Sequence, residues 1–180
     1  MNTCIALLRG VNVSGQNAMR MAALRDTMAG LGLRDVQTYL QSGNIVFRTD
    51  KSDGAKLAAK IKVAIKQDFG HEVAVLVMTA EDLGTIADSN PLWPKTGGDA
   101  PLFHATFLFQ RVAAATFNAL KLPAATGERV LLFGNAVLLH CPHGYGKTKL
   151  NNNFFERALK VEATTRNWRT VLALRTLCGV

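Results

Sequence analysis

Residues 36–47 read VQTYLQSGNIVF and decide the fold of the first half of the chain. Two β-prone runs, Val36 to Leu40 and Ile45 to Phe47, flank the pair Ser42-Gly43. Glycine adopts a positive φ at no steric cost, so this pair predicts a tight turn between two antiparallel strands. The stretch therefore predicts a β-hairpin.

The segments before and after this hairpin in the sequence have apolar residues at helical spacing. A stripe between Met21 and Leu31 precedes it, and residues spaced four apart between Leu57 and Phe69 follow it, closed by Gly70. Short apolar runs at 3–8 and 73–78 predict two further strands, one before the first helix and one after the second. The resulting order, β-α-β-β-α-β, is the split β-α-β arrangement of ferredoxin-like folds.

The same order begins again after a segment rich in proline and glycine, residues 90–101. A strand, a helix and a hairpin turned at Gly134-Asn135 are followed by two helical segments. We therefore predict an α+β protein of two tandem ferredoxin-like (split β-α-β) halves, 1–89 and 102–180, joined by a linker at 90–101. In the second half, a C-terminal helix is expected in place of the last strand.

Composition limits the class of protein. A chain of 180 residues, 48% hydrophobic and 19% charged, is typical of one globular domain or two small subdomains. No apolar run has the length of a membrane span, and the first residues lack the pattern of a secretory signal. Three cysteines without CxxC spacing favour a reducing compartment, so we expect a cytoplasmic protein.

The net charge of +8 is concentrated in the second half. Residues 1–90 contain 10 Lys and Arg against 9 Asp and Glu, whereas residues 91–180 contain 11 against 4. A one-sided positive field attracts phosphates, from nucleic acid to phosphorylated metabolites. A solvated basic surface without a partner is the alternative, and the charge alone does not decide between them.

Strand directions gather polar side chains at one edge of the first sheet. In a split β-α-β unit, the end of the first strand and the turn between the second and third strands lie at the same edge. Loop 9–17 is therefore expected beside turn 41–44, with Arg9 within hydrogen-bond reach of the turn. Asparagine and glycine are ordinary turn formers, but so many uncharged donors around one arginine also suit a binding site. The residues of this rim are Arg9, Asn12, Ser14, Gln16, Asn17, Gln41, Ser42 and Asn44.

The corresponding rim of the second half is expected to hold Gln110, Arg111, Asn135 and residues 164–167. Nearby, Gly144–Thr148 reads GYGKT and is similar to the end of a phosphate-binding loop. The full pattern needs glycine at position 141, where the chain has Cys141, so an NTPase is disfavoured. The polar and basic residues of this half that we take as candidate ligand contacts are Lys147, Lys149, Arg166 and Asn167.

Other chemistries find little support. The predicted third strand lacks the stacking aromatics of RNA-recognition domains. His140 and His143 flank Pro142, which prevents the helical spacing that a metal pair needs, and no covalent nucleophile is indicated. We expect no metal and no cofactor. We also expect Asn167 and Trp168 to open the last helix, with Trp168 packed inward and Thr165 or Asn167 as the N-cap.

Three motifs together resemble one bacterial family. The runs Ala6–Val13 (ALLRGVNV), Thr38–Phe47 (TYLQSGNIVF) and Thr165–Val171 (TRNWRTV) are similar to the domain-of-unknown-function family 1697. The resemblance implies a tandem α/β fold of ferredoxin-like halves and implies no biochemical activity. The chain departs from the family at Ser14, where glycine is usual, and at Leu139 or His140, where tyrosine is common. The recurring polar positions of the family correspond to Arg9, Asn12, Asn17, Gln41, Ser42, Asn44, Arg166, Asn167 and Thr170.

Three functions are compatible with these patterns. The basic second half favours weak binding of nucleic acid or of a phosphorylated ligand. The alternative is an enzyme acting on a small polar metabolite held at the rim of Arg9, Asn12, Gln41 and Asn44, although no rim carboxylate or histidine offers acid–base catalysis. A protein-interaction role for the 90–101 segment is the third. Whether the chain is an enzyme stays open.

Overall fold

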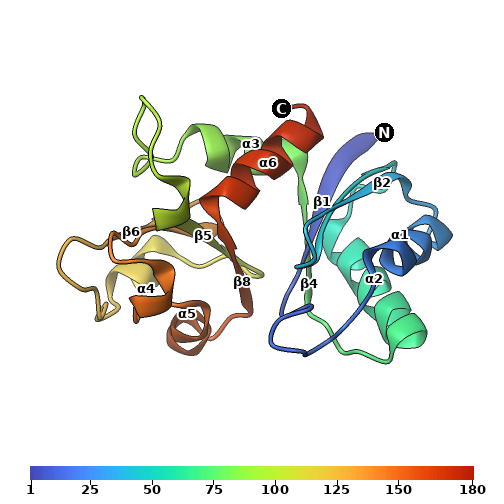
Figure 1. Ribbon diagram of the computed structural model, residues 1–180, viewed down its shortest axis with the longest axis horizontal. Helices are drawn as coiled ribbons and strands as arrows, with labels where there is room; N and C mark the ends of the chain where they lie inside the picture. The colour runs from blue at the N-terminus through green and yellow to red at the C-terminus, as the bar shows by residue number, and fades with distance from the viewer. The chain divides into compact units, whose positions relative to one another are not determined.

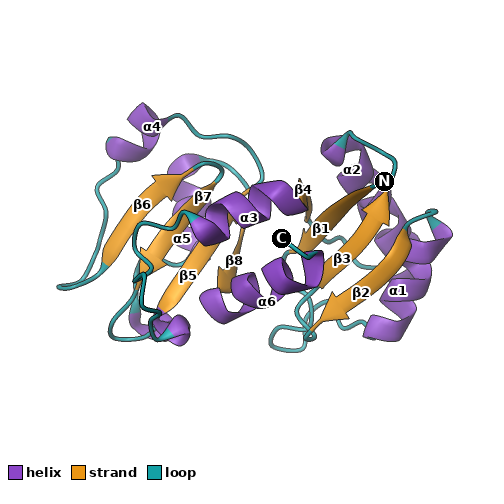
Figure 2. Cartoon of the chain, turned by 90° about the horizontal axis from the view of Figure 1, so that it is seen from above, coloured by secondary structure: helices purple, strands orange, loops and turns teal.

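The computed structural model describes residues 1–180 and forms two compact units, residues 1–84 with 174–180 and residues 85–173. Each unit contains one four-stranded antiparallel sheet (Figures 1 and 2). The predicted α+β class with two tandem ferredoxin-like halves is confirmed. No helix of the chain combines the length and the apolar character that crossing a bilayer requires.

The sheet of the first unit has the strand order β2-β3-β1-β4, with antiparallel neighbours throughout. Strands β1 and β2 therefore run in the same direction with β3 between them, as the hairpin and helix pattern predicts. The elements are β1 (Asn2–Leu8), α1 (Met21–Gly30), β2 (Arg34–Tyr39), β3 (Asn44–Thr49), α2 (Gly54–Phe69), β4 (Val75–Thr79) and the beginning of α3 (Ala80–Asp88).

Helices α1 and α2 cover one face of this sheet (Figure 1). Each contributes the predicted apolar stripe, and Gly70 ends α2 in the left-handed conformation at φ 71°. Alternate strand residues face the helices because side chains of a strand point to opposite faces. The buried side chains of this core include Ala6, Leu8, Ile45, Phe47, Leu24, Met28, Leu57, Ile61 and Ile65.

The turn between β2 and β3 is longer than the sequence predicts. Tyr39 pairs with Asn44, so the connection has the four residues 40–43 and is not a two-residue turn at Ser42-Gly43. Leu40 and Gly43 both have positive φ, 56° and 72°. A leucine in the left-handed region is uncommon, which is why the sequence did not indicate a turn starting there.

The second unit repeats the topology with the order β6-β7-β5-β8. The two-residue turn at Gly134-Asn135 is confirmed, since Phe133 pairs with Ala136. The core lies between the sheet and two helices, where Phe117 and Phe155 are buried against Val137. The elements are the end of α3, η1 (Ala100–Leu102), β5 (Phe103–Leu108), α4 (Ala114–Asn118), β6 (Arg129–Phe133), β7 (Ala136–His140), η2 (Tyr145–Lys147), α5 (Asn152–Leu159), β8 (Ala163–Asn167) and the beginning of α6 (Trp168–Cys178), whose last residues belong to the first unit.

One element of the second half differs from prediction: the last strand is present. Residues Ala163–Asn167 form β8 beside β5, and α6 follows this strand and does not replace it. The segment reads ATTRN and offers little apolar surface, but its polar groups find partners. The hydroxyls of Thr106 and Thr165 lie 2.8 Å apart across the two strands. Cross-strand threonine pairs of this kind stabilise a sheet.

The register of β8 also corrects the expected rim of the second half. Ala163 lies opposite Leu108 and Asn167 lies opposite His104. Asn135 donates to the carbonyl of Leu108, so it lies at the end of the sheet where β8 begins. Arg166 and Asn167 are at the other end of β8, because antiparallel strands reverse the order of their residues. Whether residues 90–101 act as a linker stays a prediction.

Candidate functional site

The β1–α1 loop and the β2–β3 turn meet at one edge of the first sheet, as strand directions predict. The amide of Leu8 donates to the carbonyl of Gly43 at 2.9 Å. A Cβ atom on Gly43 would lie 2.6 Å from the Cβ of Leu8. Only glycine therefore allows this approach, and it also supplies the positive φ. The turn is held directly against the end of β1.

Asn12 joins the loop to the turn. Its Nδ2 donates to the carbonyls of Gln41 at 2.7 Å and Met19 at 3.0 Å, and its Oδ1 accepts from the Met19 amide at 2.9 Å. Its φ of 53° lies in the left-handed region, which asparagine tolerates better than most residues. Every polar atom of the Asn12 side chain is therefore engaged within the protein.

The other rim asparagines are also engaged in backbone closure. Asn17, at φ 47°, donates to the carbonyl of Gly10 at 2.9 Å. Asn44 is fully buried, and its Nδ2 donates to the Tyr39 carbonyl and to the Ser42 hydroxyl, each at 3.0 Å. The amide donors that the sequence offered to a ligand thus close the loop and the turn.

Two further rim residues complete this picture. The Gln41 side chain is exposed, and its backbone carbonyl is the acceptor for Asn12. Arg9 is half-buried and has interactions of its own, and its hydrogen bond to the turn stays a prediction. The structure brings the predicted residues together, but most of their polar groups stabilise the rim itself.

In the second unit, Arg166 is buried. Its Nη1 donates to the Thr164 hydroxyl at 2.8 Å and to the Thr165 carbonyl at 3.0 Å. Burial lowers the pKa of its guanidinium to about 10, so the group stays charged at neutral pH. With only 7% of its surface exposed, Arg166 does not offer this charge to a polymer in solution.

Asn167 and Trp168 behave as predicted. Asn167 Oδ1 accepts from the amide of Arg169 at 2.9 Å, which caps the first turn of α6. Trp168 is fully buried. Asn167 Nδ2 also lies 3.3 Å from the Pro101 carbonyl, so its role in the structure is to begin the helix and fasten the strand before it.

The loop between β7 and α5, residues 141–151, presents Lys147 and Lys149, both exposed. We call it the lysine loop. The anchor of this loop is Tyr145, whose ring stacks on His104 with centroids 4.3 Å apart. The Tyr145 hydroxyl accepts from the amide of Asn152 at 3.0 Å. Asn151 caps α5 by accepting from the amide of Phe154 at 3.0 Å. The two lysines therefore extend from an ordered backbone.

A polar chain beneath this loop was not foreseen. Asn152 Oδ1 accepts from the hydroxyl of Thr165 at 3.0 Å, and Asn152 Nδ2 donates to the carbonyl of Ala163 at 3.1 Å. Burial raises the pKa of Tyr145, so its hydroxyl stays protonated. The sequence does contain one indication of this polar chain: His104 and Thr106 alternate with apolar residues, which places both on one face of β5. These groups fix the lysine loop to β5 and β8.

His104 gives the protein a pH-dependent stability. Burial lowers its pKa to about 4, so the unfolded chain binds a proton near pH 6.5 while the folded chain remains neutral. Stability is therefore lost as the pH falls from 6.5 towards 4. We expect the free energy of unfolding to be about 2 kcal/mol lower at pH 5 than at pH 7 from this group.

Urea unfolding at pH 7, 6 and 5 measures this loss. His104→Phe keeps an aromatic ring against Tyr145 and removes the titrating group, so its stability should fall less over the same interval. Between pH 7 and 8, the two proteins should show the same trend. An equal acid loss in the variant would contradict the assignment to His104.

The described geometry contains no group of three or more His, Cys, Asp and Glu side chains that could hold a metal ion. The polar groups that the structure gathers are amides, hydroxyls and exposed ammonium groups. Such groups bind and orient anions or polar molecules by hydrogen bonding and charge.

Two antiparallel sheets of ferredoxin-like order, each with helices against one face, define the class as a tandem α+β protein. The model of the protein family of unknown function DUF1697 matches residues 1–138, and the chain belongs to this family. The expected family is thereby confirmed.

A solved structure supports the architecture over the whole chain. The conserved bacterial protein SP0830 from Streptococcus pneumoniae is 24% identical, with 98% of each chain covered and a TM-score of 0.73. At this identity the likeness shows the fold alone. No curated protein matches the chain.

Proposed function

We propose that this protein binds phosphate-bearing anions weakly, nucleic acid among them, through the exposed lysine loop of its second unit. The observation that carries the proposal is the state of Lys147 and Lys149. Both side chains are exposed, and neither forms an ion pair or a hydrogen bond within the protein. An unpaired ammonium group neutralises a phosphate without first breaking an internal contact.

The surroundings of the loop support the same function. Residues 85–173 contain ten Lys and Arg against five Asp and Glu, so the field around the loop is positive. The stack of Tyr145 on His104 restrains the backbone that carries the lysines. A restrained loop loses less conformational entropy when a ligand binds.

The alternative, an enzyme acting on a small metabolite at the first rim, has less support. The Asn12, Asn17 and Asn44 amides already donate to protein acceptors, so a ligand would have to displace those bonds. Breaking a bond that closes a loop costs stability, which weakens binding there. Arg166 is buried, so it is not part of the proposed anion site. That site consists of Lys147 and Lys149.

A salt titration tests the proposal. We expect the wild-type protein to bind a short DNA duplex with a dissociation constant of roughly 10⁻⁴–10⁻⁶ M at physiological salt. Changing Lys147 and Lys149 together to alanine should reduce the slope of log affinity against log salt by about two units, one for each phosphate no longer neutralised. Fluorescence anisotropy at several salt concentrations gives this slope.

The matched control is Lys60→Ala with Lys62→Ala on α2. This double variant removes the same charge from exposed positions of the first unit, so it separates the loop from net charge. It should keep the wild-type slope. Absence of DNA binding at low salt, or an unchanged slope in the loop variant, would overturn the proposal.

A further inference from the structure

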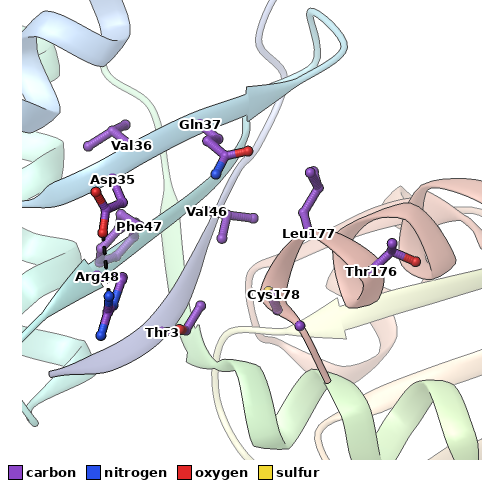
Figure 3. A pocket seen from close by; sticks show the side chains of 11 residues that line it. Thr3, Asp35, Val36, Gln37, Val46, Phe47, Arg48, Thr176, Leu177 and Cys178 are labelled. Atoms are coloured by element: carbon purple, nitrogen blue, oxygen red, sulfur yellow. Dashed lines mark ion pairs between the residues drawn. The ribbon is translucent and has the colours of Figure 1, made fainter.

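A cleft of about 580 Å³ lies on the first unit, on the sheet face opposite the Phe47–Leu24 core. Figure 3 shows its two sides: Thr3, Gln37 and Val46 lie on the strands, and Leu177 and Cys178 lie across from them at the end of α6. Thr176 and Gly179 also line the α6 side. The volume lies within the range of small-molecule sites, roughly 300–1,000 Å³. The cleft thus has the size of a site for a metabolite.

A β-bulge places a carboxylate in this cleft. The register between β2 and β3 shifts between Arg34 and Gln37, so Asp35 and Val36 together oppose Phe47. Asp35 has φ 51°, in the left-handed region. Bulges re-aim side chains and often adjoin functional sites, and backbone strain also gathers there.

At the bulge, Asp35 and Arg48 form an ion pair that uses only part of the hydrogen-bonding capacity of either group. Arg48 Nη1 lies 3.6 Å from Asp35 Oδ2, and the two side chains are 51% and 64% exposed. A guanidinium has five N–H donors and a carboxylate accepts about four hydrogen bonds, so one long contact leaves both groups free for a ligand. Gln37 adds an amide that makes no hydrogen bond within the protein.

The α6 side of the cleft also favours a positively charged group on the ligand, as the Asp35 carboxylate does on the strand side. The carbonyl end of α6 carries the negative pole of the helix dipole, which attracts a cation. Burial raises the pKa of the Cys178 thiol to about 11, so the thiol is protonated at neutral pH and is not an activated nucleophile. The exposed Leu177 and the buried Val46 supply apolar contact.

We infer that this cleft binds a small zwitterion of the free amino-acid type. Its carboxylate contacts Arg48, its ammonium contacts Asp35 beside the end of α6, and its apolar part lies between Val46 and Leu177. Adjacent opposite charges on the protein match adjacent opposite charges on the ligand. This site is separate from the proposed lysine loop, and neither depends on the other.

The test is a titration of the ¹⁵N-labelled full chain with each of the twenty standard L-amino acids, followed by NMR. Members with apolar side chains should shift the amide signals of residues 35–37, 46–48 and 176–179 at low-millimolar concentration. The N-acetyl and the C-terminal amide derivatives of the tightest member should each bind about 10- to 100-fold more weakly, since each loses one charge-assisted contact.

Two variants assign the contacts. Arg48→Gln should weaken the free amino acid by the same factor and leave its C-terminal amide unchanged. Asp35→Asn, which keeps a residue tolerant of positive φ, should weaken the free amino acid and leave its N-acetyl derivative unchanged. The control is Arg34→Gln, which lies on the same strand as Asp35 but outside the cleft. This variant should bind as the wild type does.

Three results would overturn the inference. One is a panel in which no amino acid shifts the cleft signals. The second is equal binding of the free and the blocked compounds. The third is wild-type affinity in Arg48→Gln, with unfolding curves confirming that all variants are folded.

Discussion

Replacing Gly43 by alanine is expected to lower the free energy of unfolding by about 3 kcal/mol. Two costs add at this position. An L-residue at φ 72° is strained, and the new methyl group would lie 2.6 Å from the Cβ of Leu8, which β1 holds in the core. Because the Leu8 amide also donates to the Gly43 carbonyl, the turn cannot move away without losing that bond.

Gly15→Ala is the matched control for strain without contact. Gly15 has φ 75° on the same rim, but a Cβ there would meet nothing within 4 Å. Its cost should be about 1 kcal/mol, from backbone strain alone. Urea unfolding of both variants measures the difference. Equal losses would show that the approach to Leu8 is not what requires glycine at position 43.

Asn12→Gly is expected to cost about 2–3 kcal/mol. Glycine keeps the left-handed backbone at this position, so the loss isolates the side-chain hydrogen bonds. Three bonds disappear, two with Met19 and one with the Gln41 carbonyl. The Met19 amide should also exchange its hydrogen faster, because its acceptor is removed.

Gln41→Ala separates this role from ligand binding. Asn12 bonds to the backbone of Gln41, so removing the Gln41 side chain should leave stability within about 0.5 kcal/mol of the wild type. Thermal or urea unfolding gives both values. A small effect of Asn12→Gly would mean that the loop is held by other contacts and that the Asn12 amide is free for a ligand.

The sequence predicted the order of the first half well because apolar spacing encodes which face of each element is buried. The stripe of Met21, Leu24 and Met28 faces the core as its spacing requires. Strand β8 was missed because its stability comes from backbone pairing with β5 and from the Thr106–Thr165 contact. These depend on residues distant in sequence, which a local pattern does not contain.

The candidate site shows a different limit. Strand directions correctly predicted that loop 9–17 meets turn 41–44, but not that the asparagine amides are already bonded there. Arginine is almost never fully buried unless paired, so Arg166 was expected at the surface. The cleft near Arg48 could not be predicted, because residues 176–179 reach it only through the fold.

The first unit is made of two segments that are far apart in the chain, and this affects how it folds during synthesis. Residues 174–180 belong with residues 1–84, although 89 residues separate the two segments. A ribosome adds about 5–20 residues per second, so the N-terminal segment waits about 4–18 s for the last piece of its own unit. During that interval the strand face that later borders Leu177 and Cys178 is open to solvent. The N-terminal unit is therefore incomplete during that interval, and it becomes complete only when the last turn of α6 has been made.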